Sequence, residues 1–107
     1  MMLFKNPAAA LEHEIAQEKA SALGRLGRQL ERALLALRTF DAAQAGAARH
    51  DRKRRDHLVA EAGQALWYLI VQRDALGFYG SESVMVDYAV PAEVRSRMGP
   101  LQSPAIS

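Results

Sequence analysis

Cysteine is absent from the 107 residues of this sequence. Its absence excludes disulfides, thiolate nucleophiles and zinc sites with cysteine ligands. Long apolar runs are also missing: the longest is residues 65–71, and a helix that spans a bilayer needs about 20 apolar residues. Because no stretch near the N-terminus has the apolar core of a signal peptide, we expect a cytoplasmic protein with no membrane partner.

The sequence also has no large excess of one charge. Fourteen basic residues stand against twelve acidic residues, which gives a net charge of +2, although the calculated pI is 9.3. Half of the residues are hydrophobic and 24% are charged. This balance is typical of a folded domain and not of a disordered chain. We expect residues 1–107 to form a single domain.

A long amphipathic pattern occupies the first part of the chain. At about 100° per residue, its apolar residues fall within an arc of about 140°, and they are Leu11, Ile15, Ala22, Leu26, Leu30, Ala33, Leu34, Leu37 and Phe40. Asn6 suits the N-cap and Pro7 the first helical position. The pattern predicts one helix over residues 6–42. Gly24 and Gly27 interrupt it and indicate the close approach of a neighbouring helix, with a kink as the alternative.

A second pattern predicts a helix over residues 51–76 that stops at Gly77. The residues of its inner face are Leu58, Ala62, Ala65, Leu66, Leu69, Ile70 and Leu76. Trp67, Tyr68 and Val71 lie on the other side, so this helix is apolar nearly all round. Such a helix is usually buried on both sides. One partner is then the first helix, and we expect the other to be a second copy of the chain.

The C-terminal part predicts short helices within residues 81–99. Ser81 can cap the first of them, and Pro91 can begin the next. A strand at residues 84–88 is the competing interpretation, because β-branched residues are frequent there. The lack of a second strand to pair with it favours the helix. We expect residues 100–107 to form a flexible tail.

Together these elements predict an all-α fold, in which two long helices form an antiparallel hairpin and short C-terminal helices pack on its flank or end. Two hairpins would pair into a four-helix bundle, as a homodimer with Trp67, Tyr68 and Val71 at the interface. The function expected from this architecture is a structural or protein-interaction module.

A basic segment gives the alternative function. Residues 49–57 carry a charge of +3 and the rest of the chain carries −1, and the basic members of the segment are Arg49, Arg52, Lys53, Arg54 and Arg55. Side chains of this kind contact the phosphates of nucleic acids or acidic lipids. The competing interpretation is a solvated start of the second helix, neutralised by nearby acidic residues.

No constellation of residues points to catalysis. His57 and Glu61 share a helix face, but two ligands do not make a metal site. The chain has no HExxH, P-loop or GxSxG motif, and its carboxylates are spread along the helix faces. We therefore assign no catalytic residue, no metal and no cofactor, and we do not class the chain as an enzyme.

Several short motifs follow one another along nearly the whole chain. They are Leu23-Gly24-Arg25-Leu26-Gly27, Ala65-Leu66-Trp67-Tyr68, Val71-Gln72-Arg73-Asp74-Ala75-Leu76-Gly77, Asp87-Tyr88, Val90-Pro91, Glu93-Val94 and Arg97-Met98-Gly99. In this order they resemble a family of small uncharacterised helical proteins of proteobacteria, a domain of unknown function. The resemblance implies a small α-helical bacterial protein and carries over no activity, cofactor or site.

Overall fold

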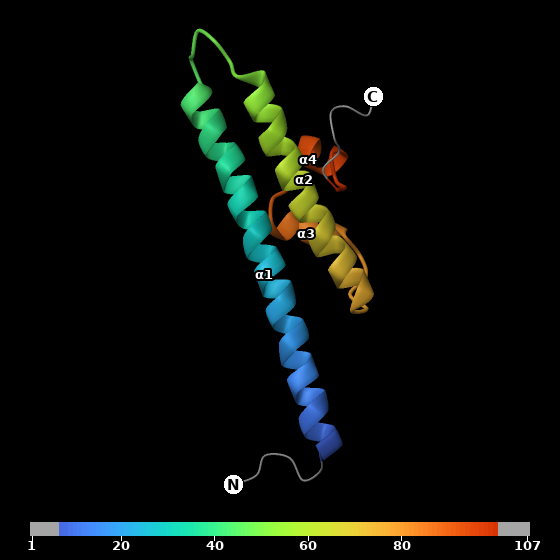
Figure 1. Ribbon diagram of the computed structural model, residues 1–107. Coiled ribbons are helices and arrows are strands. Elements are labelled where there is room, and N and C mark those ends of the chain that lie inside the picture. Colours follow the sequence, from blue (N-terminus) through green and yellow to red (C-terminus); the bar gives the residue numbers. More distant parts are fainter. Residues whose placement is uncertain (1–6, 101–107) are drawn as a thin grey trace.

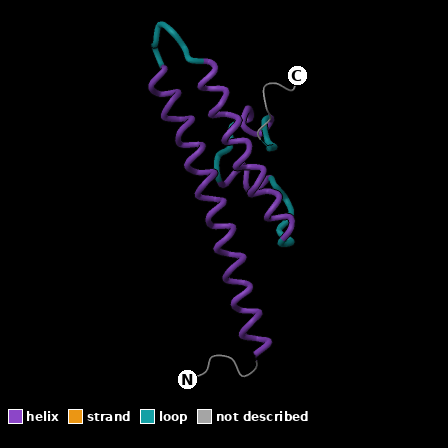
Figure 2. The backbone as a smooth tube through the Cα atoms, in the orientation of Figure 1, coloured by secondary structure: helices purple, strands orange, loops and turns teal. Residues whose placement is uncertain are grey.

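The computed structural model describes residues 7–100, which contain four helices and no strand (Figures 1 and 2). The helices are α1 (Pro7–Gln44), α2 (Arg52–Ala75), α3 (Glu82–Asp87) and α4 (Ala92–Ser96). The predicted all-α class and the long helix pair are confirmed. The expected cap at Asn6 and most of the expected tail lie outside the described residues.

The helices α1 and α2 form an antiparallel hairpin (Figure 1). Gly46 lies in the connecting turn with a positive φ of 76°, a backbone conformation that glycine adopts without strain. Asp51 then caps α2, because its carboxylate accepts a hydrogen bond from the amide of Arg54 at 2.9 Å. At its other end, α2 is followed by its C-cap Leu76 and by Gly77, which has a φ of 89°.

The hydrophobic core draws on all four helices. Its buried members are Leu30, Leu34, Leu37, Leu58, Val59, Ala62, Ala65, Leu66, Leu69, Val84, Met85 and Val94. Val94 comes from the shortest helix, α4, and is fully buried. Full burial of a large aliphatic side chain contributes about 1.5–3 kcal/mol. The short C-terminal helices are therefore part of the packed fold.

The α3 helix decides between the two interpretations of residues 84–88. Residues 84–87 belong to α3 and Tyr88 is its C-cap, so the strand interpretation is wrong. The expectation that the Ser81 side chain caps this helix is also wrong, because Ser81 occupies the N-cap position without a side-chain capping bond. Ser83 instead donates its hydroxyl to the carbonyl of Gly80 at 3.3 Å.

Two glycines allow the C-terminal segment to lie against the hairpin. A Cβ atom at Gly27 would collide with the Tyr88 hydroxyl, and a Cβ atom at Gly63 would collide with the Arg97 carbonyl. The close approach expected at Gly27 therefore exists, but a tyrosine side chain makes it and not a helix. Gly24 meets only the end of its neighbour Arg28. The segment thus covers one flank of the hairpin.

The first helix is much longer than its partner, with 38 residues in α1 against 24 in α2. Its N-terminal part extends past the end of α2 (Figure 1), and every residue from 11 to 21 is exposed. The side chains of Leu11 and Ile15 are 56% and 45% exposed. They belong to the same apolar arc that packs on α2 further along, so this arc continues into a part of α1 that no other described element covers.

Candidate functional site

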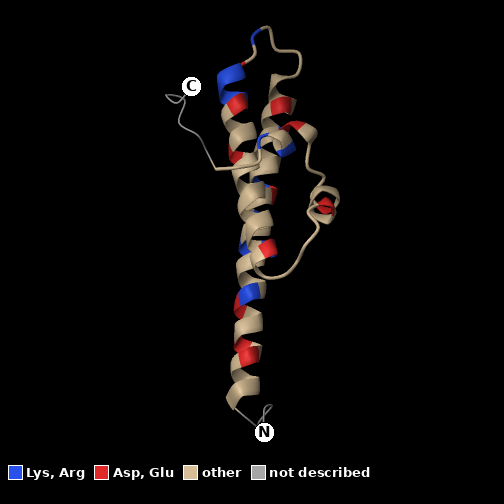
Figure 3. Ribbon diagram, turned by 90° about the vertical axis from the view of Figure 1, so that its right-hand side faces the viewer, with Lys and Arg blue, Asp and Glu red and all other residues tan. Residues whose placement is uncertain are grey.

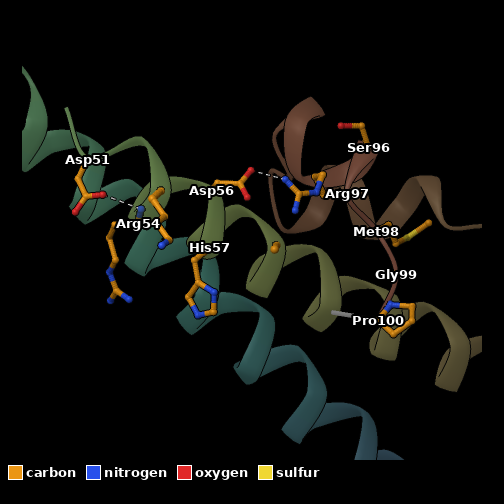
Figure 4. Close-up of a pocket in the computed structure, with 11 residues that line it drawn as sticks. Asp51, Arg54, Asp56, His57, Ser96, Arg97, Met98, Gly99 and Pro100 are labelled. Atoms are coloured by element: carbon orange, nitrogen blue, oxygen red, sulfur yellow. Dashed lines mark hydrogen bonds and ion pairs between the residues drawn. The ribbon is translucent and has the colours of Figure 1, made fainter. Parts of the chain in front are cut away.

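A cleft of about 880 Å³ lies between the start of α2 and the segment that follows α4 (Figure 4). Its lining residues are Asp51, Lys53, Arg54, Asp56, His57, Ala60, Ser96, Arg97, Met98, Gly99 and Pro100. The cleft brings two residues of the predicted basic segment, Lys53 and Arg54, together with His57 and Arg97. The basic segment did not include Arg97, because Arg97 lies far from it along the chain.

The two carboxylates of this cleft already have partners. Arg97 pairs with Asp56, with 2.6 Å between Nη1 and Oδ1, and Asp51 caps the amide of Arg54 (Figure 4). Lys53 and the guanidinium of Arg54 take part in no ion pair among residues 7–100. Two cations therefore remain available at the wall of the cleft.

Arg55 has a different position from the rest of the basic segment. Its Nε lies 2.7 Å from an oxygen of Asp41 on α1, and its Nη2 lies 2.6 Å from an oxygen of Glu93 on α4. Two further hydrogen bonds make both contacts bidentate, the arrangement that the planar guanidinium favours. Arg55 therefore connects three helices.

The Arg55 cluster also shifts the ionisation of its members. The Arg55 guanidinium lowers the pKa of Asp41 and the pKa of Glu93, through its hydrogen bonds above all. In turn the two carboxylates raise the pKa of Arg55 above its ordinary value. With its donors committed to these carboxylates, Arg55 is a structural link and does not belong to the candidate anion contacts.

The remaining cations of the segment are Arg49, Arg52, Lys53 and Arg54, and all four are exposed. They lie in the turn and in the first turn of α2, where basic residues gather at one end of the hairpin (Figure 3). This places the candidate anion contacts of the sequence at the tip of the molecule.

The residues predicted for a dimer interface are only partly accessible. The side chains of Tyr68 and Val71 are 40% and 46% exposed, whereas Trp67 is half-buried. The rings of Trp67 and Tyr68 are 5.4 Å apart and tilted by 48°. Tyr68 and Val71 therefore offer apolar surface on α2, and Trp67 is less exposed than either of them.

A groove runs between α1 and α2. One stretch of about 610 Å³ is lined by Ala22, Arg25, Leu26, Arg28, Gln29, Arg32 and Gln72. A second stretch of about 460 Å³ is lined by Arg32, Leu35, Ala36, Thr39, Phe40, Arg54 and Leu58. Arg32 borders both stretches, so they follow one another along the hairpin. Gly27 faces Tyr88, and Arg25 and Arg32 lie about 140–160° away from it around α1. The groove therefore opens on the side opposite α3.

Charges along α1 are divided between its two halves. Residues 7–21 contain three glutamates and one lysine, whereas residues 22–40 contain four arginines and one glutamate. The acidic residues are Glu12, Glu14 and Glu18, and the basic ones are Arg25, Arg28, Arg32 and Arg38; all seven are exposed. The helix thus has an acidic part beyond the end of α2 and a basic part beside the groove.

The histidine–glutamate pair on α2 does not amount to a metal site. His57 Nε2 lies 2.8 Å from Glu61 Oε1, but no third ligand joins them, and residues 7–100 contain no group of three potential ligands that could hold a metal ion. Among the same residues, no helix combines the length and the apolar character needed to cross a bilayer.

These features define a small all-helical protein built on a hairpin of two long helices, with one flank covered and the other open. The chain belongs to a family of unknown function, DUF6665, whose model matches residues 1–105. The resemblance to a domain of unknown function is therefore confirmed. No curated protein and no solved structure matches the chain.

Proposed function

We propose that this protein is a helical interaction module that forms a homodimer through the side of the hairpin opposite α3. The observation that carries the proposal is the uncovered N-terminal part of α1. There Leu11 and Ile15 continue the apolar arc of the core into solvent. Contiguous apolar surface of this kind marks an interaction site.

Surface on α2 supports the same conclusion. Tyr68 and Val71 expose apolar area, and Tyr68 lies one helical turn from Gln72, which borders the groove. Tyrosine is frequent at the centres of protein interfaces because it buries a large area at low entropic cost. Two hairpins that met through this side would bring four long helices into one assembly.

Light scattering coupled to size-exclusion chromatography tests the proposal. We expect the wild-type protein to have the mass of two chains at micromolar concentration. Tyr68→Asp and Val71→Asp should each shift the mass toward one chain, because the charge would be buried without a partner. Val86→Asp is the matched control, since Val86 is an exposed valine on α3. A monomeric wild-type protein would overturn the proposal.

A second candidate function is contact with nucleic-acid phosphates. The observation that favours it is the cleft in which Lys53 and Arg54 stand beside His57 and Arg97. Arg49 and Arg52 extend this basic surface along the tip of the hairpin.

Fluorescence anisotropy with labelled duplex DNA and single-stranded RNA tests this second candidate. Affinity should fall steeply with salt, because binding releases counterions from the phosphates. The double variant Lys53→Ala, Arg54→Ala should have a shallower salt dependence, whereas Arg38→Ala, an exposed arginine on α1, should not. No binding at about 50 mM salt would rule out this function.

A further inference from the structure

We infer that two copies of this chain pair through α1 in antiparallel orientation, so that the acidic N-terminal part of each α1 lies along the basic part of the other. This inference rests on the proposed homodimer. It adds the orientation of the two chains, their register and the residues in contact.

The first argument is charge complementarity between the two halves of α1. Three of its four exposed glutamates lie before residue 21, and its four exposed arginines follow residue 24. An antiparallel pair brings the acidic part of each chain to the basic part of the other. A parallel pair would place glutamates opposite glutamates and arginines opposite arginines, and like charges placed together in an interface cost several kcal/mol.

The second argument is that these side chains share one face of α1. Leu11, Glu18, Arg25 and Arg32 follow one another at intervals of seven residues, the spacing that aligns side chains along a helix–helix seam. Glu14 and Arg28 flank this line. The face is adjacent to the one that packs on α2, and it borders the groove that Arg25, Arg28 and Arg32 line.

The spacing also determines the register. When Glu18 of one chain lies opposite Arg25 of the other, Glu14 falls beside Arg28 and Leu11 falls beside Arg32. The two-fold axis then passes between Ser21 and Ala22. Small side chains at the axis let two helices approach closely. Because the interface is symmetric, each contact occurs twice.

The apolar residues of the uncovered part find partners in the same arrangement. Ile15 lies on the side of the face nearest α2, so in the second chain it reaches the groove beside Leu26 and Gln72. Tyr68 is one turn from Gln72 along α2. The pairing therefore covers Leu11 and Ile15, the apolar residues that the chain leaves exposed, and it brings Tyr68 to the edge of the interface.

Charge reversal tests the pairing. We make two double variants, one with Glu14→Arg and Glu18→Arg and the other with Arg25→Glu and Arg28→Glu. Each should raise the dimer dissociation constant by at least about tenfold, because like charges then face each other across the interface. An equimolar mixture of the two variants should form a mixed dimer. Glu31→Arg and Arg38→Glu are the controls, since these exposed residues of α1 lie on its other side, and neither should change the dimer.

Orientation is tested by introduced cysteines, because the chain has none of its own. Under mild oxidation Ser21→Cys should link to itself across the axis, and Glu14→Cys should link to Arg28→Cys in a mixture. Glu14→Cys alone should remain unlinked. Self-linking of Glu14→Cys would indicate a parallel pair and overturn the inference.

The outcomes separate this inference from the proposed function. A dimer that persists unchanged in both charge-reversal variants would overturn the α1 pairing and leave the homodimer in place. A wild-type protein that is monomeric in light scattering would overturn both. Weakened dimers in each variant, with a mixed dimer on combination, would support both.

Discussion

The carbonyl group of Arg97, just after α4, lies directly against Gly63 in the middle of α2. A Cβ atom at residue 63 would stand 2.7 Å from the carbonyl carbon of Arg97 and closer still to its oxygen. Near this contact the amide of Gly99 donates a hydrogen bond to the carbonyl of Gly63 at 3.4 Å. Gly63 thus allows the backbone after α4 to pack on α2, where it forms one wall of the basic cleft.

Gly63→Ala should lower the free energy of unfolding by about 1–3 kcal/mol, because the added methyl group meets backbone atoms that cannot rotate away. The matched control is Gly24→Ala in α1. Its methyl group would meet only the flexible end of Arg28, with Nη1 at 3.2 Å, and the higher helix propensity of alanine should raise stability by up to about 1 kcal/mol. Urea denaturation at equal protein concentrations measures both, and effects of the same sign would contradict the structure.

Gly27→Ala should also destabilise the fold, but through a side chain. The atom in the way is the hydroxyl of Tyr88, and the ring carbon that carries it is 3.4 Å from the position that the new methyl group would take. Tyr88→Phe removes that hydroxyl and should restore part of the lost stability. A double-mutant cycle by thermal denaturation should give a coupling of about 1 kcal/mol, and strict additivity would show that the two residues do not interact.

Arg55→Lys should destabilise the protein even though the charge is kept. An ammonium group cannot form two bidentate contacts at once, so the link between Asp41 and Glu93 would be lost. Since all three side chains are partly exposed, we expect a loss of about 0.5–1 kcal/mol in the free energy of unfolding. Arg52→Lys, three residues earlier in α2, is the control and should leave the unfolding midpoint unchanged.

The same cluster predicts how stability depends on pH. Arg55 lowers the pKa of Asp41 and the pKa of Glu93 in the folded state. In the unfolded chain these groups titrate at about 3.9 and 4.3. Their ionised forms therefore stabilise the fold above those values, and this contribution disappears as the pH falls through the lower folded-state values.

Carboxyl carbon NMR titrations check this prediction. In the wild-type protein Asp41 and Glu93 should titrate below their ordinary range, and in Arg55→Met both should return to it. The fall in stability below about pH 4 should be shallower in Arg55→Met. An unchanged titration of both carboxyls in the variant would show that the cluster does not form in solution.

The long helices were predictable because their signals are local. Apolar residues recur at the helical period along α1, and Asp51 precedes α2 as a side chain able to cap it. The short segment around Val84 was ambiguous. Its β-branched residues favour a strand, whereas the lack of a second strand favours a helix. Burial of Val84 and Met85 in the core stabilises the helix.

The site was less predictable, because its contacts join residues far apart in the sequence. Asp41 and Glu93 are 14 and 38 residues from Arg55, and no spacing rule relates residues at such distances. The basic segment therefore looked like five equivalent cations. The sequence also did not reveal the contact at Gly63. A glycine within a helical pattern indicates a cost in helix stability, but it does not indicate which backbone segment packs against it.

Local sequence is enough to make the chain helical, to place its two long helices and to divide the charge along α1. These properties follow from interactions between residues three or four positions apart, which any window of the chain contains. Tertiary packing decides which side of the hairpin is covered. That depends on where the chain returns after α2, and Gly27 and Gly63 bring it to one flank, which leaves the opposite groove and the N-terminal part of α1 open.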